Sequence, residues 1–317
     1  MRQRLEVVVF AYNHGVFIEQ ALNSVLSQIT DFGLSIRIHD DASTDNTSAV
    51  VERVLADARI DWRLESAPHN RYASGIEYFH EFIAASDAEF VAFLDGDDFW
   101  ADNSKLQTQV DLLDKHRGAA LCHHRVSMFD GDAFFDIDWP PPVYREQALP
   151  GETLCSENII SSSSVVLRMS MFPREMPPGF NGLRIGDYPM WAFATDAHEI
   201  AFVDRVMSVY RVHDTNIWAT LSPAERFDRE IEARIYIAAN IAHNTRWRTA
   251  LVDRIADHVA RVEGSWVMRA RADAAAQASA AEGARQELQQ LLASRSWRVT
   301  QPLRAITRLL SRFNRRV

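Results

Sequence analysis

Cysteine is scarce in this sequence of 317 residues, which contains two, Cys122 and Cys155. Two cysteines form at most one bridge, so the disulfide framework of a small secreted domain is excluded. No spacing of cysteine and histidine resembles a structural zinc site. We therefore expect two thiols in a reducing compartment and a fold stabilised by an ordinary hydrophobic core.

Long apolar runs are missing as well. No stretch approaches the roughly 20 apolar residues that a membrane-spanning helix needs. The apolar run nearest the N-terminus, residues 7–11, is too short to be the core of a signal peptide. The sequence therefore predicts a protein that is made and kept in the cytoplasm.

Positive charge is scarce outside one segment. The net charge is -9, and because seven arginines and no acidic residue follow Ser294, the remainder is more acidic still. The part of the chain before residue 295 is too acidic to bind the phosphates of nucleic acid well, so we expect no nucleic-acid partner.

The arginine-rich end has a pattern of its own. Apolar residues recur at spacings of three and four between Val299 and Phe313, which predicts a basic amphipathic helix over residues 295–317. Such a helix suits an anionic membrane surface and would hold the protein peripherally on the inner face of the cell membrane. A helix that packs on the protein itself or on a partner is the alternative.

Apolar, β-branched runs alternate with amphipathic stretches through the first hundred residues. Strands are predicted at residues 5–11, 34–39, 61–65 and 90–94, and helices at 17–28, 48–58 and 75–85. Further strands are predicted at 119–128, 161–169 and 200–210, and helices at 106–116 and 188–194. This order predicts an α/β fold with a mainly parallel, Rossmann-like sheet and helices on both faces.

A capping box at residues 222–225 (Ser-Pro-Ala-Glu) marks a change to a helical pattern. We therefore predict an α/β domain over residues 1–221, an α-helical C-terminal extension over 222–294, and the basic helix over 295–317. The helices after Ser222 could pair with copies of themselves to form a homo-oligomer.

Polar residues follow three of the predicted strands at the point where each strand ends. These are residues 12–13 (Tyr-Asn), 40–41 (Asp-Asp) and 95–98 (Asp-Gly-Asp-Asp). Because ligands of parallel sheets bind beyond the carboxyl ends of the strands, we expect these groups on one rim of the sheet.

The last of these groups concentrates negative charge. Asp95, Asp97 and Asp98 place three carboxylates within four residues, which is costly unless a cation neutralises them. Mg²⁺ or Mn²⁺ prefers oxygen ligands and often takes one or two protein carboxylates together with substrate phosphates. The sequence favours a divalent metal site here over a solvated acidic turn.

Five segments carry a family resemblance: residues 7–14, 40–47, 93–98, 186–191 and 210–213. In this order they resemble the family 2 glycosyltransferases of the GT-A fold. Residues 294–304 resemble the C-terminal segment of some bacterial members of the family that build surface polysaccharides. The resemblance covers about residues 5 to 215 and implies a metal-dependent, inverting sugar transfer. The donor would be a nucleoside-diphosphate-sugar, with a UDP-sugar favoured, and the acceptor a hydroxyl of a glycan or of a lipid-linked glycan.

The resemblance also implies roles for single residues on the donor side. Ala11, Tyr12 and Asn13 would line the nucleotide base. Asp41, together with Asp40, would contact the base or ribose.

Further roles concern the sugar-phosphate part of the donor. Asp95 would lie near the ribose, whereas Asp97, with Asp98 beside it, would hold the metal. His213 would bind the metal or the diphosphate. Arg71 could reach the donor phosphates or simply be an exposed arginine, and Arg211 could balance the diphosphate or simply pair with a surface acid.

The general base that the resemblance implies is Asp187. Inversion at the anomeric carbon needs a carboxylate that removes the proton of the acceptor hydroxyl. The family usually has an acidic pair, Glu then Asp, whereas this chain has Gly186 before Asp187. The sequence therefore does not show which group supports the base. The alternative is that Asp187 only caps the N-terminus of the following helix.

Two other functions remain compatible with the sequence. A haloacid-dehalogenase-like phosphatase also has Asp-x-Asp after a strand, although on the first strand of its fold. A non-catalytic module that binds a nucleotide-sugar is suggested by the missing acid before Asp187.

Overall fold

The structure is a computed structural model that describes residues 3–73, 78–135, 139–155, 157–241, 247–257 and 259–260, with the isolated positions 279, 283 and 286. The chain divides into two compact units, Met1–Ile255 and Ala256–Val317. The predicted basic helix over 295–317 lies outside the described residues, as does most of the predicted extension after residue 260. The predicted division of the chain at residues 221 and 294 stays a prediction.

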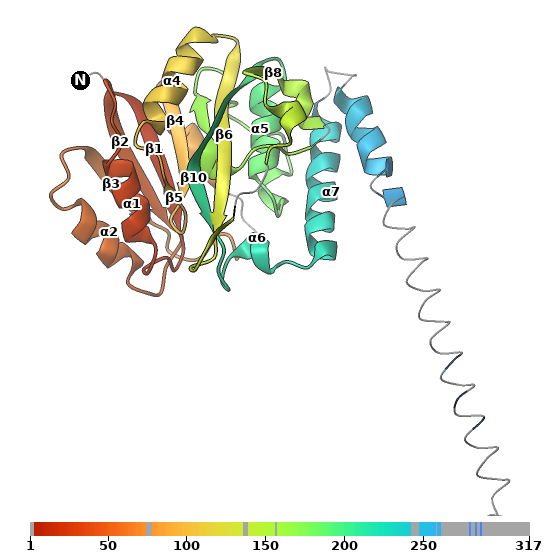
Figure 1. The fold of residues 1–317 in the computed structure, drawn as a ribbon, viewed down its shortest axis with the longest axis horizontal. Helices are drawn as coiled ribbons and strands as arrows, with labels where there is room; N and C mark the ends of the chain where they lie inside the picture. The colour runs from red at the N-terminus through yellow and green to blue at the C-terminus, as the bar shows by residue number, and fades with distance from the viewer. Residues whose placement is uncertain are drawn as a thin grey trace, which may run out of the picture. The chain divides into compact units, whose positions relative to one another are not determined.

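One half of the central sheet is parallel. It contains the strands β1 (Gln3–Ala11), β2 (Gly33–Asp40), β3 (Asp61–Ser66) and β4 (Phe90–Asp95), in the spatial order β3-β2-β1-β4 (Figure 1). Each of these strands was predicted to within two residues, β1 and β4 from their apolar runs and β2 from its alternation. This half of the sheet is parallel because its strands alternate with helices along the chain, and the helices provide the crossover connections that parallel neighbours need.

The other half of the sheet continues as β9-β6-β10-β5. Strands β6 (Ala119–Phe129) and β10 (Glu199–Arg211) are parallel to each other, whereas β9 (Val166–Arg168) and β5 (Phe99–Trp100) run antiparallel to their neighbours. Two short strands pair at the margins: β7 (Phe134–Phe135) with β6 and β8 (Ala148–Pro150) with β10. The sheet is therefore mixed but mainly parallel.

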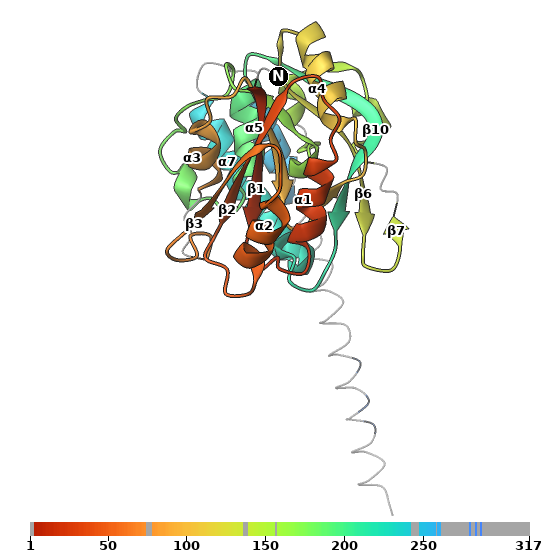
Figure 2. The ribbon, with the colours of Figure 1, turned by 90° about the vertical axis from the view of Figure 1, so that its left-hand side faces the viewer.

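Helices cover both faces of the sheet (Figure 2). On one face lie α1 (Ile18–Leu26), α2 (Thr47–Leu55) and α4 (Lys105–Lys115), and on the other lie α3 (Phe79–Ala84), α5 (Asp187–Thr195) and α7 (Pro223–Asn240). A short helix, α6 (Ile217–Thr220), follows β10, and residues 247–257 are also helical. Short 3-10 helices occur at Pro142–Tyr144, Gly151–Cys155, Ser162–Ser164 and Phe180–Gly182.

Strand β1 divides the core into two layers. Val7 and Val9 belong to the cluster under α1, α2 and α4, whereas Val8 and Phe10 belong to the cluster under α3, α5 and α7. Successive side chains of a strand point to opposite faces, so a continuous apolar run indicates a strand that is buried on both sides. Each such side chain contributes roughly 1.5–3 kcal/mol on burial.

The predicted strand over 161–169 is shorter in the structure. Residues Ser162–Ser164 form a 3-10 helix, and only Val166–Arg168 pairs in the sheet. The predicted capping box is present, since Ser222 accepts a hydrogen bond from the amide of Glu225 and the Glu225 side chain accepts one from the amide of Ser222. Helix α7, which it starts, buries Ala233 and Ile237 in the core.

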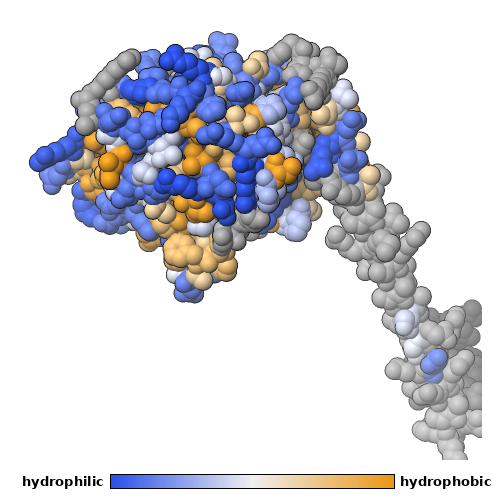
Figure 3. All heavy atoms as spheres, turned by 45° about the horizontal axis from the view of Figure 1, so that its top comes forward, coloured by the Kyte–Doolittle hydropathy of each residue, from blue (hydrophilic) through white to orange (hydrophobic). Residues whose placement is uncertain are grey.

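Among the described residues, no helix is long and apolar enough to cross a membrane. The face shown in Figure 3 is mostly hydrophilic, with apolar residues in small areas between the charged ones.

Candidate active site

The carboxyl ends of three parallel strands lie side by side. In the register of the sheet, Ala11 of β1 is opposite Asp40 of β2, and Phe10 is opposite Asp95 of β4. The chain leaving β2 stays attached, because the amide of Asp41 donates to the carbonyl of Ala11 at 2.9 Å. The structure thus places the polar residues that follow these strands on one rim.

Asn13 connects the first two strand ends. Its backbone lies in the left-handed region, with φ of 55°, where asparagine is one of the few tolerated side chains. Its amide donates to Oγ of Ser43 at 2.8 Å, and its Oδ1 accepts from the amide of Thr44 at 2.7 Å. Tyr12 beside it is 42% exposed and stands at the open side of the rim.

Asp40 and Asp41 both accept hydrogen bonds from loop residues. Asp40 accepts from the amide of Ser43 at 2.9 Å and from the hydroxyl of Ser48. Asp41 is fully buried, and its two oxygens accept from the amides of Arg71 and Tyr72 at 2.8 and 3.0 Å. In this state both carboxylates fix the loops that frame the rim, and their contacts with a donor stay predictions.

Arg71 does not point freely into the rim. Its guanidinium group donates to Glu81 at 2.9 Å and lies over the ring of Tyr78 at 5.3 Å. Tyr72 next to it accepts a hydrogen bond from Arg229 of α7 at 3.1 Å. The predicted contact of Arg71 with donor phosphates stays a prediction that requires the side chain to leave Glu81.

The pKa values of the three aspartates in the turn after β4 differ strongly from the usual value. Burial, with the charges of Asp97 and Asp187, raises the pKa of Asp95 to about 8. Burial and the charges of Asp97 and Asp95 raise the pKa of Asp98 well above its usual value. Burial acts in the same direction on Asp97, but the hydrogen bond from His213 and the charges of His14 and His213 bring its pKa below the usual value.

Asp97 is therefore the carboxylate of this turn that is held in its charged form. Its Oδ2 lies 3.0 Å from Nε2 of His213, 3.4 Å from Nδ2 of Asn216 and 3.7 Å from Nε2 of His14. Nδ1 of His213 lies 2.9 Å from the hydroxyl of Thr215. If the hydroxyl accepts a hydrogen bond from Nδ1–H, the neutral ring has no proton on Nε2, which can then bind a metal ion.

The pair of Asp97 and His213 fits a divalent cation. Adjacent ligands of an octahedral site with bonds of about 2.1 Å lie roughly 3.0 Å apart, which is the spacing of Oδ2 and Nε2. Within the described part of the chain, no group of three or more His, Cys, Asp or Glu side chains is arranged to hold a metal ion. The two side chains could therefore hold a cation only together with oxygen ligands from substrate or water.

Asp98 is turned to a different partner. Its Oδ1 accepts from the amide of Arg211 at 2.9 Å, and its side chain is buried. The structure thus distinguishes it from Asp97, which the sequence did not. Its predicted role as a metal ligand stays a prediction.

Arg211 joins the ends of β4 and β10. Its Nε donates to the carbonyl of Asp97 at 2.8 Å, and its Nη2 donates to Gln20 of α1 at 2.6 Å. The guanidinium group lies over the rings of Phe17, Phe99 and Phe129, at 5.0, 5.2 and 5.6 Å. These contacts hold the acidic turn in place, and the predicted contact of Arg211 with donor phosphates stays a prediction.

Asp187 lies at the start of α5. Its Oδ2 accepts from the hydroxyl of Ser162 at 3.0 Å, and its Oδ1 accepts from the amide of Tyr188 at 2.7 Å. Burial raises the pKa of Asp187 above its usual value. Because its charge also raises the pKa of Asp95, Asp187 belongs to the same rim as the acidic turn.

Four side chains at this rim were missed by sequence reasoning: His14, Gln20, Ser162 and Asn216. His14 is the last residue of the recognised segment 7–14, although it was given no role, and Asn216 follows the segment 210–213 by three positions, so these motifs were the available signal. Nothing in the sequence pointed to Gln20 or Ser162, because their partners are distant in the chain.

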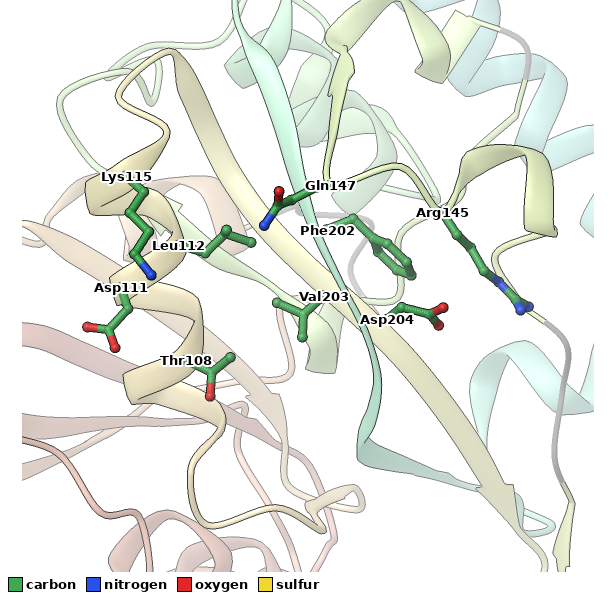
Figure 4. A pocket seen from close by; sticks show the side chains of 9 residues that line it. All are labelled: Thr108, Asp111, Leu112, Lys115, Arg145, Gln147, Phe202, Val203 and Asp204. Carbon is green, nitrogen blue, oxygen red and sulfur yellow. The ribbon is translucent and has the colours of Figure 1, made fainter.

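A hollow lies away from this rim. It has a volume of about 430 Å³ and is formed by α4, with Leu112 and Lys115, and by β10, with Phe202 and Asp204 (Figure 4). None of the residues that line it is a predicted site residue. The rim described above is therefore the only part of the described chain where the predicted residues gather.

A parallel sheet with acids and amides on the carboxyl rim defines a ligand-binding α/β protein. Comparison with known sequences is more specific: residues 6–174 match Glycosyl transferase family 2. The chain belongs to this family, and the predicted family is confirmed. A protein of Mycobacterium tuberculosis without a described function is 28% identical over 270 residues, which cover 84% of this chain and 74% of the relative.

Solved structures confirm the predicted GT-A fold. The mannosyltransferase PcManGT from Pyrobaculum calidifontis, in complex with GDP-Man and Mn²⁺, has a TM-score of 0.61 at 18% identity, over 96% of this chain and 85% of that one. TarS of S. aureus (residues 1–349), in complex with UDP-GlcNAc, has a TM-score of 0.59 at 17% identity, over 80% of this chain and 71% of that one.

Proposed function

We propose that the protein is a metal-dependent, inverting glycosyltransferase. It moves a sugar from a nucleoside-diphosphate-sugar, with a UDP-sugar favoured, to a hydroxyl of a glycan or lipid-linked acceptor. Its place is in the synthesis of cell-surface polysaccharide, in the cytoplasm and peripherally at the membrane. Family membership and fold support the transferase class, and the details rest on the geometry of the rim.

One observation carries the proposal. The pKa of Asp95 is raised to about 8 by burial, by the charge of Asp97 and by the charge of Asp187. The candidate metal ligand and the candidate base therefore lie near the same carboxyl group, although they come from β4 and from the start of α5. An inverting transfer needs this combination, because the leaving diphosphate and the attacking hydroxyl flank one anomeric carbon.

Each side chain has a defined part in the reaction. Asp97 and His213 would hold the divalent cation, which when bound neutralises charge on the leaving diphosphate. Asp187 removes the proton of the acceptor hydroxyl as that oxygen attacks the sugar. Burial, which raises the pKa of Asp187, makes its carboxylate a stronger base once it is ionised.

The nucleoside would bind beside the ends of β1 and β2. Tyr12 is exposed there and offers a ring surface to a base, with Ala11 and Asn13 on either side. Asp40 and Asp41 would complete this part of the pocket, and Arg71 and Arg211 would lie towards the phosphates. Among the structural relatives, TarS was solved with UDP-GlcNAc and PcManGT with GDP-Man and Mn²⁺.

The donor site is tested by thermal unfolding with UDP, GDP and dTDP, each with and without Mn²⁺. A nucleotide that binds only the folded state stabilises it by about 2.7 kcal/mol at one hundred times its Kd. We expect one nucleotide to stabilise the protein only with Mn²⁺, and Asp97→Ala to abolish this effect. Asp132→Ala is the matched control, because Asp132 is exposed and lies after β6.

Stabilisation by no nucleotide would overturn the donor site. Stabilisation without release of nucleoside diphosphate from the matching nucleotide-sugar would favour the non-catalytic module. The phosphatase alternative predicts phosphate release from simple phosphoesters, and the described position of the motif, after the fourth strand instead of the first, argues against it.

A further inference from the structure

The acid that the family usually has before its base is missing here, and the structure shows what stands near the base instead. Gly186 occupies the N-cap position of α5, with φ of -97° and ψ of -32°. This conformation is open to any residue, so the backbone does not require glycine. The first acid of the pair is therefore absent for a reason other than backbone strain.

The hydroxyl of Ser162 is the side-chain group that binds Asp187. Its Oγ donates to Oδ2 at 3.0 Å, while Oδ1 accepts the amide of Tyr188 at 2.7 Å. Each carboxylate oxygen thus has one donor and keeps a further lone pair. Both oxygens of the carboxylate are therefore fixed by a hydrogen bond, and either can still accept a proton.

Ser162 is itself held firmly. It begins the 3-10 helix Ser162–Ser164, in which the amide of Val165 donates to the carbonyl of Ser162 at 3.1 Å. The carbonyl of Ser163 accepts from the indole of Trp100 at 3.0 Å, and the hydroxyls of Ser163 and Ser208 lie 3.2 Å apart. Contacts to β5 and β10 therefore fix the turn that presents the Ser162 hydroxyl.

We propose that Ser162 is the positioning residue of the general base and takes the place of the missing acid. This inference rests on the proposed role of Asp187. A hydroxyl orients the carboxylate by one directional hydrogen bond, without adding a second negative charge. The base of this chain would therefore ionise more readily than it would with a further acid at position 186.

Among the acids of the packed elements, Asp95 at the end of β4 is the one whose pKa the charge of Asp187 raises. The Ser162 hydrogen bond and the Tyr188 amide both lower the pKa of Asp187, against the effect of burial. Removing the hydroxyl should therefore raise the pKa of Asp187 and let its carboxylate rotate.

The test compares Ser162→Ala with Ser162→Thr, which keeps a hydroxyl, and with Ser161→Ala. Ser161 is a matched control, because its hydroxyl is 3.5 Å from that of Ser163 and does not contact Asp187. The assay is hydrolysis of UDP-, GDP- and dTDP-glucose with Mn²⁺, in which water is the acceptor. We expect Ser162→Ala to lower kcat roughly 10- to 100-fold and to leave the KM for the donor unchanged. The acid limb of the pH profile of kcat should shift to higher pH.

A second readout does not need turnover. The carboxyl ¹³C signal of Asp187, assigned by its loss in Asp187→Asn, is followed by NMR against pH. We expect the pKa of Asp187 to rise in Ser162→Ala and to stay near the wild-type value in Ser162→Thr and Ser161→Ala. An unchanged pKa in Ser162→Ala, or an unchanged kcat in a protein that hydrolyses the donor, overturns the positioning role.

Asp187→Asn separates this inference from the proposed function. If Asp187→Asn keeps wild-type turnover, Asp187 is not the base and the proposed mechanism fails, whatever Ser162 does. If Asp187→Asn is inactive while Ser162→Ala keeps the wild-type kcat and pH profile, only the role of Ser162 fails.

Discussion

The imidazole Nε2 of His213 lies 3.0 Å from Oδ2 of Asp97, although 116 positions separate the two residues. The sheet explains the meeting. Strand β5 runs antiparallel to β10 with Phe99 opposite Val209, so the same register continued by two residues brings Asp97 opposite Arg211. Beyond the last paired residues, the side-chain Nε of Arg211 donates to the carbonyl of Asp97 and holds the two segments together two residues before His213.

Removal of the imidazole should weaken metal binding. In His213→Ala we expect the affinity for Mn²⁺, measured by thermal unfolding against metal concentration, to fall at least about tenfold. In Thr215→Val the ring loses the hydroxyl at Nδ1, and a loss of roughly tenfold is expected, as for other outer-shell partners. His116→Ala, at the C-cap of α4, should bind Mn²⁺ like the wild type. Equal affinity in all four proteins would remove His213 from the metal site.

Lys105 gives a stability prediction outside the active site. It is fully buried, its Nζ has no hydrogen-bond partner in the described structure and lies 4.2 Å from the ring centroid of Trp100. Burial lowers its pKa from 10.5 to about 7. Between these values the unfolded state binds a proton that the folded state does not, so this group makes stability rise with pH by up to about 1.4 kcal/mol per pH unit.

We therefore expect Lys105→Met to be more stable than the wild type at pH 7, by urea unfolding. The difference between the two proteins should shrink as the pH rises from 7 to 10. Lys115→Met is the control on the same helix, because Lys115 is exposed. A constant difference across this pH range would show that Lys105 does not titrate as proposed.

The guanidinium group of Arg211 should contribute to stability in a way that lysine cannot replace. Lysine lacks the planar fork that binds Asp97 and Gln20 together and stacks on the aromatic rings. We expect Arg211→Lys to lower the free energy of unfolding by roughly 1.5–3 kcal/mol, the range of hydrogen bonds to charged groups. Arg205→Lys alters an exposed pair with Asp102 and should cost less than about 1 kcal/mol. Similar losses in both variants would contradict the specific role of Arg211.

The long elements of this fold could be predicted because their signals are local. Strands such as β1 and β4 are continuous apolar runs, and α7 begins with a capping box and proline. The strands β5, β7 and β8 have two or three residues each. They are too short for any periodicity. β5 and β8 exist because the distant strand β10 offers hydrogen bonds, whereas β7 pairs with β6 just before it in the chain.

The site was likewise predictable where its signals are local and not where they depend on distant residues. Its acids follow strand ends, so Asp95 and Asp97 could be placed on a rim before their partners were known. The difference between Asp97 and Asp98 could not be predicted, because it depends on whether His213 or the amide of Arg211 faces the carboxylate. Ser162 lies in a run of four serines, which shows neither a face nor a partner.

Helix α7 has a consequence for how such enzymes can be recombined. Its Ile237 shares a core with Trp191 of α5, the helix that carries Asp187, and its Arg229 binds Tyr72 in the loop held by Asp41. A chimera that exchanges everything after residue 221 between relatives would replace the surface that packs against α5 and the side chain that binds Tyr72. Such exchanges should preserve folding only where the new helix brings side chains that fit α5.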